Sequence, residues 1–168
     1  VYTYLNQDDP VVGGNAPERI ALRRAIAMGF SSDEFIKVFY GGHGLPANQI
    51  LPPGTSGHDP ALAAKSLHDP AAARALLDRF GYRDRDGDGF REAPDGKPLT
   101  LVQSSTPDSD SREADTLWLK NMAAIGIKMT VNSQPFNDLL KRSTAGQLMM
   151  FNLGFRACEP SGFNSLMT

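Results

Sequence analysis

The residues with the clearest chemical pattern are acidic and lie in one short segment that contains glycine. Asp84, Asp86 and Asp88 alternate with other residues, and Gly89 follows directly. Calcium loops of the EF-hand type place oxygen ligands at this spacing and a glycine at the sixth position. Residues 84–95 therefore raise the hypothesis of a calcium-binding module.

The second half of this segment fits a calcium loop less well. Position seven would be the Phe90 carbonyl, position nine Glu92, and position twelve Asp95, whose side chain is shorter than the glutamate used there. A proline-containing stretch then leads into a predicted strand, whereas an EF-hand continues as a helix. Aspartates beside glycines also support tight turns, so the alternative interpretation is the tip of a β-hairpin.

Other reactive side chains lack the partners that catalysis or metal binding needs. The chain has one cysteine, Cys158, and three histidines, His43, His58 and His68. The thiol has no second cysteine for a Cys-x-x-Cys motif or an internal disulfide. The histidines lack the i, i+4 spacing of a helical metal site. An enzyme that uses Cys158 is the weakest hypothesis, and we expect no catalysis, no metal site and no cofactor.

The composition is that of an ordinary globular protein. The chain has 168 residues, of which 40% are hydrophobic and 21% charged, enough for one domain or one lobe of a larger protein. A net charge of −2 argues against nucleic acid as a partner. The chain begins at Val1 without a signal peptide and shows no clear end, so we expect it to be cut from a longer chain.

The elements that must position these side chains follow from periodicity and capping signals. Predicted strands cover residues 1–6, 99–105, 128–132 and 147–155. Predicted helices cover residues 17–29, 31–40, 69–80, 108–125 and 136–143. Strands and helices alternate in the later half, which favours an α/β fold with a mixed, largely parallel sheet flanked by helices. Residues 41–68 form a long loop, and such loops are often functional.

The first predicted helices carry specific start signals. Ser31 can cap the second helix, with Glu34 three residues later as the partner in a capping box. Phe30 and Phe35 flank this cap as a hydrophobic staple. Asp69 can cap the third helix, which has a proline in its first turn.

Five short motifs occur in a fixed order along most of the chain. They are LRRAIAMGFS at 22–31, GGHGLPA at 41–47 with LPPG at 51–54, HDPAAARALL at 68–77, GYRDRDGDGFRE at 81–92 and GKPL at 96–99. Each motif alone is weakly specific, but their order resembles that of extracellular solute-binding proteins of family 5. This family is the peptide- and oligopeptide-binding class that supplies ABC importers.

The resemblance implies a type II periplasmic-binding-protein fold of which residues 1–168 form a single lobe. The second lobe would be missing from this chain, and the two lobes would close on a solute by a hinge motion. The implied partners are a small-molecule or peptide solute and an ABC permease in the inner membrane. The implied protein is a monomer at the periplasmic or extracellular face of the cell membrane. An apolar or aromatic patch should be exposed where the second lobe closes.

The resemblance also implies a ligand site at the end of the strand predicted at 147–155. Peptide-binding members end this strand with a G-W-x-x-D pattern, and its aspartate pairs with the α-amino group of the ligand. Here Phe155 replaces the tryptophan and Cys158 falls at the aspartate position. A thiol is mostly uncharged near neutral pH and cannot hold an ammonium group as a carboxylate does.

Two neighbouring charges leave the ligand class open. Glu159 can replace the aspartate with a shift of one residue, whereas Arg156 would favour an anionic ligand. Both side chains can equally be solvated loop charges. The candidate ligand-binding residues are therefore Phe155, Arg156, Cys158 and Glu159, and the loop at 41–58 is a candidate border of the same site.

Overall fold

The computed structural model describes residues 2–46, 51, 53–62 and 68–154. The strands are β1 (Tyr2–Leu5), β2 (Thr100–Ser105), β3 (Lys128–Ser133) and β4 (Met150–Leu153). The helices are α1 (Pro17–Gly29), α2 (Ser32–Phe39), α3 (Pro70–Arg79), α4 (Ser109–Ala124) and α5 (Phe136–Thr144), with a 3-10 turn at Pro60–Leu62. Within these residues, no helix combines the length and apolar character that a bilayer crossing needs.

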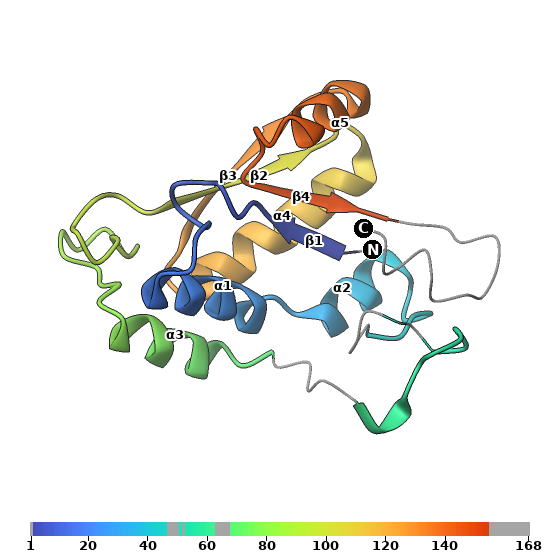
Figure 1. Ribbon diagram of the computed structural model, residues 1–168, viewed down its shortest axis with the longest axis horizontal. Coiled ribbons are helices and arrows are strands. Elements are labelled where there is room, and N and C mark those ends of the chain that lie inside the picture. Colours follow the sequence, from blue (N-terminus) through green and yellow to red (C-terminus); the bar gives the residue numbers. More distant parts are fainter. Residues whose placement is uncertain (1, 47–50, 52, 63–67, 155–168) are drawn as a thin grey trace.

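The sheet has four strands in the order β1-β4-β2-β3 (Figure 1). Strand β2 pairs in parallel with both β3 and β4, while β1 runs antiparallel to β4. The expected mixed, largely parallel sheet is thus confirmed. The first and last strands in sequence order, β1 and β4, lie side by side, so segments from the two ends of the described chain meet in the sheet.

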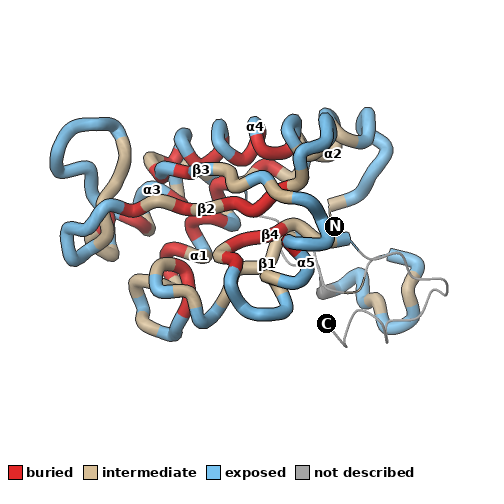
Figure 2. Tube along the Cα trace, turned by 90° about the horizontal axis from the view of Figure 1, so that it is seen from above, coloured by how far each residue is buried: buried red, intermediate tan, exposed pale blue. Residues whose placement is uncertain are grey.

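Helices cover both faces of the sheet. The main core joins α1, α3 and α4 to one face and includes Leu22, Leu77, Leu101 and Met122, all fully buried. A smaller cluster on the other face joins α5 to β1 and β4. Figure 2 shows buried residues in β2 and β4, in α1 and along the inner side of α4.

The pleat of β4 connects these two clusters. Met150 belongs to the main core, and the next residue, Phe151, packs against Leu139 and Leu148 in the smaller cluster. Successive side chains of a strand point to opposite faces. Asn152 therefore returns to the face that carries Met150.

The helix caps form largely as the sequence predicts. Ser31 accepts a hydrogen bond from the Glu34 amide at 3.2 Å, and Asp69 accepts one from the Ala72 amide at 2.8 Å. The staple rings of Phe30 and Phe35 lie 5.8 Å apart between centroids. The Glu34 carboxylate, however, pairs with Lys120. This ion pair joins α2 to α4, and the predicted capping box is replaced by a tertiary contact.

The last strand is shorter than predicted. The sequence favours a strand over 147–155, but β4 begins at Met150. The Gln147 amide donates to the Arg142 carbonyl at 2.9 Å and so still completes the end of α5. Ladder pairing with β1 starts only at the Leu5–Met150 pair.

We expect Leu101→Ala to lower the free energy of unfolding by about 2–5 kcal/mol, because it empties a fully buried site on the central strand β2. Urea unfolding measures the change. Leu119→Ala is the matched control, since Leu119 on α4 is 38% exposed and should lose far less. Equal losses for the two variants would contradict the placement of the core.

Candidate ligand-binding site

The carboxyl ends of two parallel strands mark the candidate site. Strand β2 ends in Ser104 and Ser105, and the parallel strand β4 ends just after Asn152. Ligands of open α/β sheets bind outside the carboxyl ends of the strands. Helix α2 and the amino end of α4 also reach this edge.

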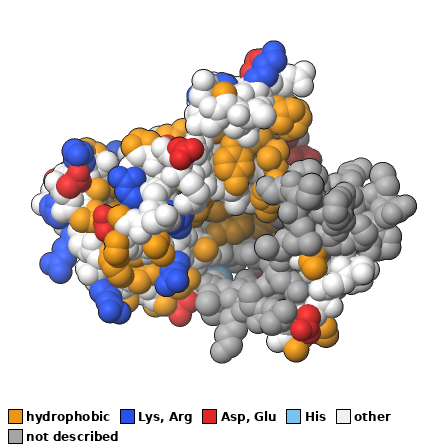
Figure 3. Space-filling view, viewed as in Figure 1, with side chains coloured by type: hydrophobic (Ala, Val, Ile, Leu, Met, Phe, Trp, Pro, Cys, Tyr) orange, Lys and Arg blue, Asp and Glu red, His pale blue; other side chains and the backbone are white. Residues whose placement is uncertain are grey.

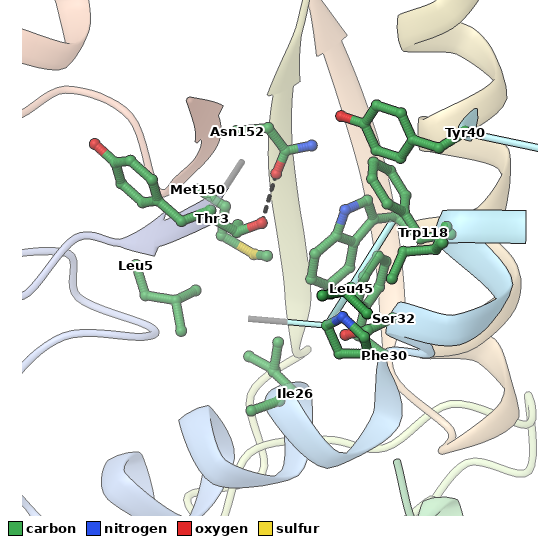
Figure 4. A pocket seen from close by; sticks show the side chains of 15 residues that line it. Thr3, Leu5, Ile26, Phe30, Ser32, Tyr40, Leu45, Trp118, Met150 and Asn152 are labelled. Carbon is green, nitrogen blue, oxygen red and sulfur yellow. Dashed lines mark hydrogen bonds between the residues drawn. The ribbon is translucent and has the colours of Figure 1, made fainter. Parts of the chain in front are cut away.

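A groove with a volume of about 420 Å³ lies between β1, β4, α1 and α2. Figure 3 shows hydrophobic side chains gathered around a hollow in this face of the molecule. Ile26, Phe30 and Trp118 lie on the helical side of the groove, and Leu5 and Met150 lie on the strand side (Figure 4). The groove is therefore mainly apolar.

Stacked aromatic rings give the helical side its shape. Phe30 stacks on Trp118 with ring centroids 4.0 Å apart, and Phe35 stacks on Phe39 at 4.7 Å. Trp118 is only 4% exposed and therefore belongs to the core as well as to the groove wall. Tyr40 follows α2 and is 45% exposed, so its ring is available for contact.

One polar pair faces this apolar surface. The Thr3 hydroxyl donates to the Asn152 side-chain carbonyl at 2.6 Å across the β1–β4 pair. Figure 4 shows the amide nitrogen of Asn152 directed away from Thr3, toward the side of the groove where Tyr40 lies. An amide nitrogen has two donor hydrogens, which suits a carbonyl or carboxylate of a bound solute.

A smaller pocket of about 230 Å³ lies next to the groove, at the end of β2. The two cavities share Phe35, Tyr40 and Asn152. The smaller pocket adds two carboxylates, Asp110 and Asp115, to its aromatic walls. No lysine, arginine or histidine is among the described residues that line either cavity.

Asp115 is the most unusual side chain of this pocket. It is only 6% exposed, and its Oδ1 atom has no hydrogen-bond partner among the described residues. Burial raises the pKa of the Asp115 carboxyl, a hydrogen bond from Ser105 opposes this shift, and the negative charge of Asp108 adds to it. An ionised carboxylate is costly in such a place unless a donor or a cation compensates it.

Asp108, at the start of the same helix, has the opposite environment. It caps α4 by accepting from the Ser111 amide at 2.8 Å. Hydrogen bonds from the Thr106 hydroxyl and from Ser111 lower its pKa to about 2. Asp108 is therefore a structural carboxylate, and its role agrees with the predicted helix start.

The four predicted ligand residues, Phe155, Arg156, Cys158 and Glu159, lie outside the described residues. The described chain ends at Gly154, two residues after Asn152. From the loop proposed as a border, Leu45 and Pro46 line the groove.

Sequence reasoning missed Asp115, although a signal was present. Asp115 lies three residues before Trp118 and seven before Met122, so it falls on the buried stripe of α4. A charged residue on such a stripe is informative because it is rarely buried without a partner. Asp110, Phe35 and Tyr40 carried no comparable signal, because only the tertiary structure brings them together.

The acidic turn lies at the other end of the molecule from the carboxyl end of β4 (Figure 1). Carboxylate oxygens of Asp84, Asp86, Asp88 and Glu92 lie within 4.8 Å of one another. The three aspartates already accept hydrogen bonds from backbone amides of the turn. The geometry is that of a turn stabilised by its own backbone, which agrees with the hairpin interpretation.

The end of the acidic segment departs further from a calcium loop. Asp95, the expected twelfth ligand, pairs with Lys97 at 2.7 Å. Isolated antiparallel β-bridges pair the backbone of Glu92 with Arg83 and with Pro98, so the segment forms a small antiparallel structure.

The mixed sheet, the helices on both faces and the aromatic groove at the strand ends define an α/β ligand-binding protein of the type II periplasmic-binding class. The chain belongs to the bacterial extracellular solute-binding proteins, family 5 Middle, whose family model matches residues 1–168. The family predicted from the motifs is thus confirmed, and its description agrees with the expected location outside the cell.

The comparisons with individual proteins agree with the family. The chain is 33% identical over 128 residues to di/tripeptide-binding protein 2 of Pseudomonas aeruginosa strain UCBPP-PA14. This match covers 75% of the chain and 22% of the relative, so the chain spans about a fifth of that protein.

Two solved structures show the same fold. The periplasmic binding protein DppA of Helicobacter pylori, in complex with the peptide STSA, superposes with a TM-score of 0.77 at 22% identity, over 98% of this chain and 28% of DppA. NikA of Brucella suis, in complex with Fe(III)-EDTA, superposes with a TM-score of 0.74 at 22% identity, over 99% of this chain and 33% of NikA. The family and these neighbours are binding proteins, and they do not favour the calcium-module hypothesis.

We expect millimolar calcium to leave the melting temperature unchanged, because the aspartates of the turn are already engaged by backbone amides. A thermal-shift titration with calcium checks this, with magnesium as the control for ionic strength. A melting temperature that rises steadily with calcium would contradict the hairpin interpretation, since a ligand of the folded state must stabilise it.

We expect Asp115→Asn to reduce the loss of stability that accompanies a rise in pH. Because the folded-state pKa of Asp115 is raised, the folded protein holds this proton more tightly than the unfolded chain does. The contribution of Asp115 to stability is therefore largest at pH values below about 4 and falls as pH rises through the raised pKa.

Urea unfolding between pH 4 and pH 7 measures the effect, and Asn at 115 keeps an acceptor for Ser105. The control is Asp33→Asn at an exposed site of α2, which should change the profile less than Asp115→Asn does. An unchanged pH profile in Asp115→Asn would contradict the buried environment of this carboxyl.

Proposed function

We propose that residues 1–168 form part of one lobe of a two-lobed substrate-binding component of an ABC importer. Outside the cell membrane, this component captures a peptide or related small solute in the cleft between its lobes and delivers it to an ABC permease in the inner membrane. The observation that carries this proposal is the aromatic groove at the carboxyl ends of β2 and β4. The chain spans only 22% of its relative, so the second lobe would be formed by the rest of the full-length protein.

The groove has the chemistry of a binding surface. Its walls are apolar and aromatic, and a few polar groups such as Asn152 can orient a solute. Tyr40 is 45% and Leu45 is 75% exposed at its rim. A solute or a second lobe that covers these side chains would remove apolar surface from water, which favours closure.

Binding without catalysis is part of the proposal. Among the described residues that line the groove and the smaller pocket, the hydroxyl groups have no histidine or lysine beside them. Histidine and lysine are common bases that activate a hydroxyl nucleophile, so this lining favours binding over catalysis.

A peptide is the favoured solute. One relative is named a di/tripeptide-binding protein, and one structural neighbour is a dipeptide-binding protein of Pseudoalteromonas sp. SM9913 in complex with Met-Leu. Phe155, Arg156, Cys158 and Glu159 follow β4 in the sequence, and we retain them as proposed ligand residues.

The test compares the intact two-lobed protein with residues 1–168 alone. Isothermal titration calorimetry against dipeptides and tripeptides should detect binding to the intact protein. The lobe alone should bind at least about 100-fold more weakly, which corresponds to roughly 2.7 kcal/mol of lost contacts. Micromolar binding by the lobe alone would contradict a shared cleft, and a response of the intact protein only to non-peptide solutes would contradict the peptide.

We expect Asn152→Ala to weaken solute binding to the intact protein by about tenfold, because it removes a donor amide from the groove. The control is Thr3→Val, which removes the internal hydrogen bond to Asn152 but keeps the amide. Calorimetry should show a smaller loss for Thr3→Val. Equal losses would mean that the Thr3–Asn152 contact, and not the free amide, supports binding.

A further inference from the structure

The smaller pocket has features that the general function of solute binding does not explain. Its volume of about 230 Å³ is below the roughly 300–1,000 Å³ that enclose a whole drug-sized ligand. It therefore suits one side chain or one end group of a solute that occupies the larger groove. The shared residues Phe35, Tyr40 and Asn152 show that the two cavities lie side by side.

Among the residues that the structure describes, the charges that line this pocket are all negative. Asp115 and Asp110 both line it, and Asp108 lies beside them at the start of α4. The nearby hydroxyl groups of Thr106 and Ser111 are already bound to the Asp108 carboxylate. An anionic group of a solute would meet repulsion here, while a cationic group would meet attraction.

The buried carboxylate points to the same ligand class independently. Asp115 is 94% buried, given its exposure of 6%, and its Oδ1 atom has no partner in the described structure. The other contacts of this side chain include a hydrogen bond from Ser105. A buried oxygen without a donor is destabilising, and a solute that supplies the donor would gain the interaction.

Aromatic rings complete the arrangement. Phe35, Phe39, Tyr40 and Phe136 line the same pocket, and Tyr40 and Phe136 are 45% and 51% exposed. The faces of aromatic rings attract ammonium and guanidinium groups, and the rings also pack against their apolar stems. Aromatic walls around a carboxylate thus fit a long cationic side chain better than a purely polar one.

We propose that this pocket is a specificity site for a positively charged group of the solute, with Asp115 as its charged partner. The inference rests on the proposed function and adds the class of solute: a peptide with an ammonium or guanidinium group placed to enter the pocket. Asp110, which is exposed, contributes to the field from the rim.

The experiment compares peptides that differ in one charge. The intact protein is titrated calorimetrically with Ala-Lys and Lys-Ala, and with the counterparts in which norleucine replaces lysine. N-acetylated versions of all four peptides separate a side-chain ammonium from the terminal one. We expect at least one peptide to bind ten times more tightly, or more, than the counterpart that lacks one of its ammonium groups, either the norleucine or the N-acetylated peptide.

The Asp115→Asn variant should reduce this ratio to about one. Asp33→Asn, an exposed carboxylate of α2 that does not line the pocket, should keep the wild-type ratio. Equal affinities of cationic and neutral peptides in the wild type would overturn the inference and leave the proposed function intact. A ratio retained by Asp115→Asn would also overturn it, whereas the absence of any peptide binding would overturn the proposed function itself.

Discussion

The pairing of β4 with two strands at once is the constraint on which the rest of the structure depends. On one side β4 pairs antiparallel with β1, and on the other it runs parallel to β2. This pairing fixes the faces of β4, so that Met150 enters the main core and Phe151 the smaller one. It also brings Thr3 to Asn152 and aims the carboxyl end of β4 at the groove.

The groove exists because helix α2 is held against the main core from several directions. The Phe30–Trp118 stack and the Glu34–Lys120 ion pair join the start of α2 to α4. Since α2 has no fully buried residue of its own, these contacts and its aromatic rings determine where it lies. The Phe35, Phe39 and Tyr40 rings consequently face the strand ends rather than the core.

The aspartates at 84–88 and Asp115 show that the environment of a carboxylate indicates its role better than the sequence pattern does. The aspartates at 84–88 form the conspicuous sequence pattern, yet they are exposed and bind backbone amides of their own turn. Asp115 belongs to no recognisable motif, yet it is buried on α4 near the end of the sheet, and its Oδ1 atom lacks a partner in the described structure. A buried carboxylate without a partner is costly, whereas water solvates an exposed one, so Asp115 carries the stronger indication of a binding role.

Local signals in the sequence determined the elements of this protein. Pro17, Ser31, Asp69 and Asp108 mark the starts of α1, α2, α3 and α4, and Gly126 follows α4 with a positive φ of 75°. Caps and periodicity act within a few residues, which is why they can be read from the sequence. The order of the motifs likewise determined the family. Only the tertiary structure decided the strand order, the later start of β4 and the pocket around Asp115, because these features depend on contacts between residues far apart in the chain.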